Sequence, residues 1–250
     1  MTKLLVASII ILIVLTTGAF AQALPPLPTD PSQILPQLGG SASGKMIQYV
    51  VIISVLSVAP GIVVMVTSFT RIVIALSFLR SGIGLQTTPA NIVLISLALF
   101  LTFFIMAPTF DRAWQDGIKP LSEGTITEAV AYDKITAPFR DFMINNVREK
   151  ELALFQDLAK DPAFGPEPSA RDLRILVPAF MISELRRGFE IGFLIALPFL
   201  IIDLIVATVT MSMGMMMLPP TVLSLPFKVL FFVLVDGWSL VVGSLIKSFH

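Results

Sequence analysis

The chain has 250 residues, of which 55% are hydrophobic and 14% are charged, and its 17 basic and 17 acidic side chains balance. Soluble domains have roughly 25% charged residues, so this composition indicates an integral membrane protein. Zero net charge without a basic tract argues against nucleic acid as a partner. The chain has no cysteine and only one histidine, His250, which excludes thiol catalysis, disulfides and Cys/His metal sites.

The first 45 residues predict a leader followed by a linker. A basic start at Lys3, an apolar run and the small-x-small sequence Ala19-Phe20-Ala21 are typical of a cleavable signal peptide over residues 1–21. An uncleaved first span is the alternative. Residues 22–45 are rich in proline and glycine, which is typical of a solvated linker and favours cleavage.

Charge divides the rest of the chain into three parts. Of its 34 charged residues, 21 lie between Asp111 and Arg174. We therefore expect an all-α membrane protein with a first hydrophobic helical hairpin over 46–110, a small polar helical domain over 111–174 and a second hydrophobic hairpin over 175–250.

Four apolar stretches lie in the two hairpins, and three of them contain a charged residue or a helix breaker. Only the stretch 91–110 has about the length and composition of a simple membrane-crossing helix. A charge at the bilayer centre costs about 3 kcal/mol, so such groups normally face a protein interior. We expect helices packed within a helical oligomeric assembly rather than four independent lipid-facing spans. The other stretches are 46–79 with Pro60, Gly61 and Arg71; 191–217 with Pro198 and Asp203; and 222–246 with Pro226, Lys228, Asp236 and Gly237.

The short loops predict the orientation. Arg71 and Arg80 border a loop without acidic residues, which places that loop on the cytoplasmic side. If the signal peptide is cleaved, the mature chain starts outside, and the polar domain 111–174 also lies outside, in the periplasm.

Within the polar domain, residues 139–160 have the periodicity of one amphipathic helix. Asp161-Pro162 and Gly165-Pro166 are expected to end it. The predicted core positions are Phe139, Phe142, Met143, Leu152, Phe155 and Leu158.

Asp203 lies in the middle of an apolar segment and has two interpretations. It forms an ion pair with Lys228 or Arg187 of another helix, or it relays protons or ions. Because no second carboxylate lies at relay spacing, we favour the structural role, and we interpret Asp236 in the same way.

A second polar segment lies between Ser183 and Gly188. Its Glu184, Arg186 and Arg187 predict an ion-pair cluster on a helix surface. Glu184 is also one of five polar residues that we expect to be buried or to support assembly; the others are Arg71, Asp203, Lys228 and Asp236. Because the one histidine is the last residue, His250, and is not available as a base, we expect neither an enzyme nor a cofactor or metal site.

Gly188 and Gly192 have the spacing of a close helix-packing motif. Glu190 lies between them, and such matches are common by chance. Ordinary helix packing is therefore the preferred interpretation.

Five methionines occupy seven positions directly before Leu218 and Pro219-Pro220. Proline cannot donate to a helix ladder, so the methionines lie at a forced break between two apolar stretches. Unbranched thioether side chains re-pack easily, which suits a deformable seal, although filling space in a helical core is the alternative. The run comprises Met211, Met213, Met215, Met216 and Met217.

Several strings resemble the FliP family, an export-gate subunit of the flagellar type III secretion apparatus. The most distinctive are IGFLIALPFLIIDLIVA at 191–207, MGMMMLPP at 213–220 and FVLVDGW at 232–238, and the resemblance covers essentially residues 50–249. It implies a pentamer-like ring that assembles with FliQ-like and FliR-like subunits in the inner membrane, within the flagellar basal body. Unfolded flagellar proteins pass through this pore, other export-apparatus proteins supply energy and recognition, and Met215, Met216 and Met217 form a gasket.

The resemblance also bears on topology and on the alternatives. In the family, segments that hydropathy identifies as spans pack into a cone raised toward the periplasm, and some never cross lipid as simple helices. The homologous injectisome subunit is the main alternative, but it usually lacks a signal peptide. A secondary transporter that uses Asp203 is a further alternative, against which the absence of inverted repeats argues. A purely structural scaffold is the last.

Overall fold

The computed structural model describes residues 49–50, 53–54, 57, 61–62, 64–85, 87–160, 169–214 and 219–249. The expected signal peptide and linker lie outside the described residues, as do Met215, Met216 and Met217. The chain divides into two units, residues 1–58 and 59–250, and all that follows concerns the second unit.

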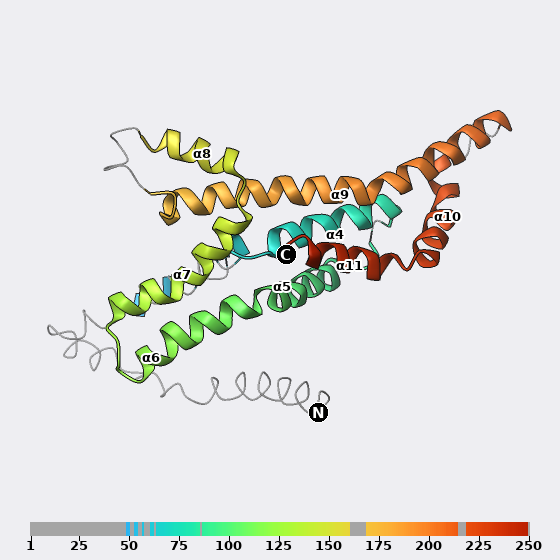
Figure 1. Ribbon diagram of the computed structural model, residues 1–250. Coiled ribbons are helices and arrows are strands. Elements are labelled where there is room, and N and C mark those ends of the chain that lie inside the picture. Colours follow the sequence, from blue (N-terminus) through green and yellow to red (C-terminus); the bar gives the residue numbers. More distant parts are fainter. Residues whose placement is uncertain are drawn as a thin grey trace, which may run out of the picture. The chain divides into compact units, whose positions relative to one another are not determined.

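The described residues form helices and no strand, which confirms the all-α class. Figure 1 shows the long α9 with α4 beside it. In chain order the elements are α4 (Phe69–Ile83), α5 (Asn91–Ala113), the π-helix η2 (Trp114–Ile118), α6 (Lys119–Ser122), α7 (Glu128–Asn146), α8 (Glu149–Leu158), α9 (Leu173–Ser212), α10 (Pro220–Leu234) and α11 (Gly237–Lys247).

Two described helices are long and apolar enough to cross a membrane, fewer than the four apolar stretches of the sequence. They are the continuous helix 91–122 and α9. The stretch 222–246 is broken into α10 and α11, which meet at 64° and count at most as one further span. The stretch 46–79 is broken at residues 66–68, whereas Gly61, where a break was expected, is helical.

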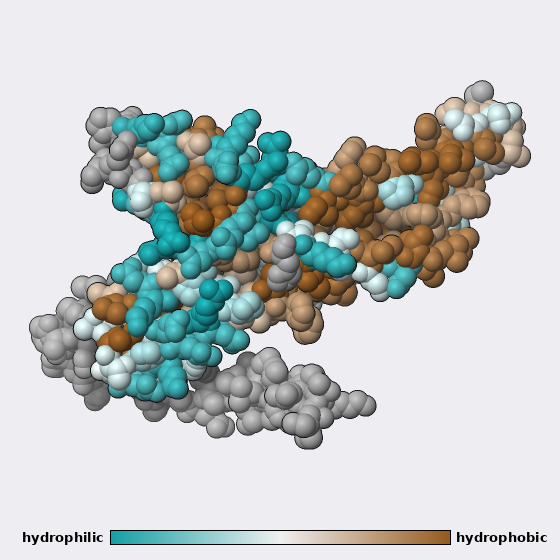
Figure 2. Space-filling model, in the orientation of Figure 1, coloured by the Kyte–Doolittle hydropathy of each residue, from teal (hydrophilic) through white to brown (hydrophobic). Residues whose placement is uncertain are grey.

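The long helix α9 extends well beyond the apolar stretch that predicted it. Its 40 residues span about 60 Å, roughly twice the thickness of the hydrocarbon core. Polar residues gather over α7, α8 and the beginning of α9 (Figure 2). Apolar residues gather over the end of α9 and over α10 (Figure 2). Asp172 caps the first turn of α9 by accepting a hydrogen bond from the backbone N–H of Arg174 at 2.9 Å. Hydrogen bonds from the Arg174 side chain lower the pKa of this carboxyl.

Helices α4 and α9 run in the same direction and pack closely through small residues. A Cβ at Gly192 would lie 2.6 Å from Cγ of Phe78, and one at Gly188 would lie 3.1 Å from Cβ of Ile74. One turn further, Gly82 of α4 approaches Ala196. Gly188 and Gly192 therefore form a close helix-packing motif, and the preference for ordinary packing was wrong.

The hydrophobic core lies mainly where α4 meets its neighbours. One cluster joins buried residues of α4, α5, α9, α10 and α11, among them Leu76, Ala98 and Leu245. A second joins Met143 of α7 to Leu176 and Phe180 of α9. Phe142 packs against both clusters and so connects the polar helices to the apolar ones.

The single helix predicted over 139–160 is wrong, because the chain breaks between α7 and α8. Val147 is extended, and the backbone N–H of Arg148 donates to Oγ of Ser183 at 3.1 Å in place of an intrahelical bond. Of the predicted core positions, Met143 is buried, but Leu158 is 56% exposed. Leu158 belongs to neither of the two core clusters.

The close approach of α4 and α9 predicts a position-specific sensitivity to added volume. Gly192→Val should lower the melting temperature of the detergent-extracted protein, because overpacking typically costs 1–3 kcal/mol. Gly243→Val provides the control, since a Cβ there meets nothing within 4 Å. Equal melting temperatures for the two variants would contradict this account of the packing.

Candidate functional site

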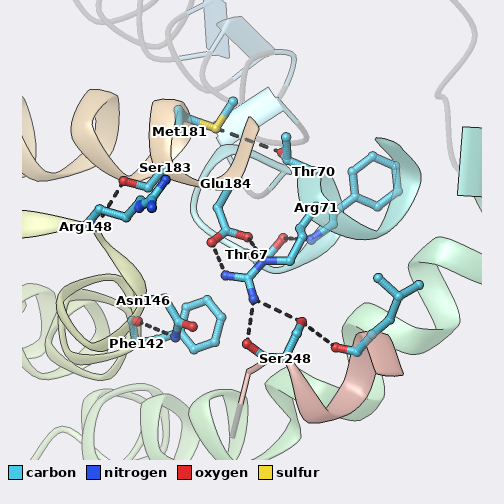
Figure 3. A network of polar contacts seen from close by, with 12 residues as sticks. Thr67, Thr70, Arg71, Phe142, Asn146, Arg148, Met181, Ser183, Glu184 and Ser248 are labelled. Atoms are coloured by element: carbon cyan, nitrogen blue, oxygen red, sulfur yellow. Dashed lines mark hydrogen bonds and ion pairs between the residues drawn. The ribbon is translucent and has the colours of Figure 1, made fainter. Parts of the chain in front are cut away.

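A buried ion pair joins α4 to α9 at the start of their contact. Arg71 and Glu184 are both fully buried. Nε of Arg71 donates to Oε2 of Glu184 at 2.9 Å, and Nη2 donates to Oε1, so the guanidinium and the carboxylate meet as two parallel forks. Figure 3 shows this pair at the centre of a polar network. The two charges compensate each other in a place where neither reaches water.

The predicted surface cluster around Glu184 is wrong. Glu184 points inward to Arg71 and not to Arg186 or Arg187. Arg186 pairs instead with Glu190 at 3.0 Å and with Glu151 of α8 at 3.6 Å. Sequence spacing along one helix did not reveal the partner, because Arg71 lies 113 positions earlier in the chain.

Serine residues complete the network around this pair, and sequence reasoning missed both of them. Nη1 of Arg71 donates to the backbone carbonyl oxygen of Ser248 at 2.7 Å and to its Oγ at 3.1 Å. Ser183 Oγ donates to the carbonyl of Ala179 and accepts from the N–H of Arg148. No local signal marks these serines, since their roles follow from distant segments of the chain.

A second ion pair joins α9 to α10. Nζ of Lys228 lies 2.6 Å from Oδ2 of Asp203, which identifies Lys228 rather than Arg187 as the partner. The same Nζ donates to the carbonyl of Gly82 at the end of α4 at 3.0 Å. Ser224 Oγ donates to the other carboxylate oxygen of Asp203. Lys228 is 6% exposed and Asp203 28%, so the pair borders an open depression of about 800 Å³.

Asp236 does not share this buried environment, contrary to expectation. It is exposed and has a left-handed backbone, with φ of 50°, at the joint between α10 and α11. The next residue, Gly237, lies beneath the ring of Phe232, where a Cβ would come within 2.1 Å of the ring. Asp236 therefore serves the bend between the two helices rather than a buried pair.

The methionine joint, residues 211–217, begins at the far end of α9. Met211 and Met213 are 62% and 67% exposed. Gly214 has φ of 73° and ends the helix, and α10 begins at Pro220, a position where proline fits because its missing N–H has no intrahelical partner. An apolar groove of about 570 Å³ runs beside the joint; it is lined by Ile205, Val209, Met213, Leu223 and Phe227, among others.

The described parts of the chain contain no grouping of three or more His, Asp or Glu side chains that could hold a metal ion. Four charged groups within the apolar helices form two pairs instead, Arg71 with Glu184 and Lys228 with Asp203. Such an arrangement holds helices in register and leaves exposed apolar surface, over α5, α9 and α10, for lipid or for other subunits. The fold and these pairs define a membrane-embedded helical protein built around paired charges.

The family model for the FliP family matches residues 52–245, and the chain belongs to that family. It is 62% identical over 211 residues to the flagellar biosynthetic protein FliP of Rhizobium meliloti (strain 1021), with 84% of this chain and 86% of that protein covered. The corresponding protein of Bacillus subtilis (strain 168) is 54% identical over 205 residues, covering 81% and 91%. That of Aquifex aeolicus (strain VF5) is 40% identical over 240 residues, covering 96% and 98%.

Membership confirms the resemblance stated from the sequence and makes the chain a component of the flagellar export apparatus. This family is not a known family of enzymes.

Breaking the first ion pair should strongly destabilise the protein. Glu184→Gln leaves the Arg71 charge uncompensated and buried, which typically costs 3–5 kcal/mol. Asp141→Asn serves as the control because its pair with Arg171 is exposed, and such pairs contribute at most about 1 kcal/mol. Thermal unfolding of the detergent-extracted variants measures the difference. Similar stability for both variants would show that the buried pair contributes little.

The second ion pair predicts an effect on assembly. Asp203→Asn should reduce the yield of the assembled complex, because Lys228 keeps its charge and loses its carboxylate. If export is coupled to protons, its rate per assembled complex should change less than the yield of assembled complex does. Size-exclusion chromatography measures the amount of assembled complex, to which the export rate is then normalised. Normal assembly with lost coupling would instead identify Asp203 as an ion-relay residue.

Proposed function

We propose that this chain is the pore-forming subunit of the flagellar type III protein export gate. Copies of it form a pentamer-like ring together with FliQ-like and FliR-like membrane subunits. Unfolded flagellar polypeptides cross the inner membrane through the ring, within the basal body, and other proteins of the export apparatus deliver them. Met215, Met216 and Met217 form the seal of the pore.

The position of the methionine joint is the observation that carries this proposal. It links the longest apolar helix, α9, to α10. The two methionines of the joint that the structure describes, Met211 and Met213, are exposed. Large apolar side chains that point to solvent are costly in an isolated chain. Methionines that several copies direct toward a common axis would cover one another.

The ion pairs support the same function by holding the helices that carry the joint. Lys228 ties α10 to both α9 and the end of α4, about two helical turns beyond the Pro219-Pro220 break. Movement can therefore be confined to residues 211–219 while the helices stay packed. A seal that opens and closes needs such a firm support.

Soft packing provides the gating mechanism. Thioether side chains make many weak dispersion contacts and no directional bonds, so an arriving polypeptide displaces them without breaking hydrogen bonds. Once the polypeptide has passed, the same contacts close the pore against water and ions. The proposal further places the polar part of the chain, residues 111–174 with 21 of the 34 charged side chains, on the periplasmic side.

The exposed apolar faces give the proposed ring its partner surfaces. Side chains such as Phe100 and Phe104 of α5, Leu204 of α9 and Leu230 of α10 have no cover within the described chain. Neighbouring copies, the FliQ-like and FliR-like subunits and membrane lipid would bury them. Glu184 and Asp203 of α9 and Lys228 of α10, by contrast, are already paired inside the chain. This favours a structural role for Asp203 over a transport site.

Replacing Met215, Met216 and Met217 together with alanine should leave the ring assembled but leaky. Alanine is too short to close the axis, so small solutes and ions should pass in the absence of substrate. Growth inhibition or dye entry in cells that express the complex measures the leak. Met65→Ala is the matched control, since Met65 is exposed but distant in sequence from the joint. A tight membrane in the triple variant would contradict the gasket.

A further inference from the structure

The two residues that follow α11, Ser248 and Phe249, contact three separate parts of the fold. We propose that they form a latch, which fixes α11 against α4 and α9 and couples its position to α7. When the latch is released, α11 moves about Asp236 while the α4–α9 packing stays intact. This inference concerns movement within one chain and does not depend on the proposed pore.

The first part of the latch completes the bonding of a buried charge. Arg71 uses Nε and Nη2 for Glu184. Among the described residues, its Nη1 donates to Ser248 alone, to the backbone carbonyl at 2.7 Å and to Oγ at 3.1 Å (Figure 3). The Ser248 hydroxyl donates its own proton to the carbonyl of Leu245 at 2.7 Å. If this turn moved away, Nη1 would remain buried without an acceptor, which is unfavourable.

The second part of the latch is an aromatic bridge. Phe249 lies with the centre of its ring 3.6 Å from Cζ of Arg71, in cation–π contact. Its ring also stacks on Phe142 of α7, with ring centres 6.0 Å apart and an interplanar angle of 21°. Phe142 in turn meets Phe180 of α9 edge-on at 5.9 Å. One side chain thus joins the buried ion pair to the polar helices.

The other end of α11 has the properties of a hinge. A 64° bend separates it from α10, and Asp236 at the bend has a left-handed conformation that is unfavourable for an L-residue with a side chain. The α11 helix itself buries Gly237, Val241 and Leu245, whereas Leu240 on its other face is exposed. Its position is therefore set by one apolar face, a strained joint and the latch.

Hydrogen exchange of the assembled complex, extracted in mild detergent, tests the latch. Phe249→Leu keeps an apolar side chain but removes the ring that contacts Arg71 and Phe142. We expect exchange to rise roughly tenfold in residues 238–248 and also in 139–146, with no change in the α4–α9 contact. Leu240→Ala is the control, because it changes the exposed face of α11 and should leave both segments unchanged.

A double-mutant cycle between Phe249→Leu and Phe142→Leu separates a latch from independent packing. Because both rings belong to one stack, the double variant should exchange no faster than the more affected single variant. The proposal would be overturned if exchange became faster in 238–248 alone, or if the effects of the two changes multiplied. It would also be overturned if all helices lost protection together, or if exchange did not change.

Discussion

The fork between Arg71 and Glu184 is the constraint on which the rest of this fold depends. A guanidinium and a carboxylate that are both fully buried stabilise each other only in one alignment of α4 and α9. From that starting point the two helices proceed in parallel, and Gly188, Gly192 and Ala196 meet successive turns of α4. A shift of one helical turn would drive side chains into backbone and also separate the charges. The ion pair contributes specificity, and the small residues allow the close approach.

A second constraint lies at the opposite end of the same contact. Lys228 bonds to Asp203 of α9 and to the Gly82 carbonyl of α4, and so ties α10 to both helices shortly after the methionine joint. Directional bonds therefore hold the supporting helices, whereas the proposed seal depends on non-directional contacts between thioether groups. The proposed seal could therefore open while the helices that support it stay packed.

The sequence predicted the helical class and gave Lys228 as one of two candidate partners of Asp203, because these follow from composition and from charges in apolar segments. It did not predict the partner of Glu184, because a contact across 113 positions has no local pattern. The break between α7 and α8 was also missed, since it depends on Ser183 accepting a hydrogen bond from a distant segment. Asp236 was interpreted as buried because its neighbours are apolar, but it lies at an exposed bend.

The most direct test of the account asks whether the methionine joints of several copies meet at one axis. The chain has no cysteine, so a single cysteine at Met216 reports only on contacts between copies. A disulfide requires Cα atoms of two residues within about 7 Å, so oxidation of the assembled complex should yield covalent dimers of this chain. Cysteine at the exposed Leu158 of α8 gives the background rate. We predict that the cysteine at position 216 yields more cross-linked dimer than the cysteine at position 158. Monomers alone would contradict a seal formed by converging methionines.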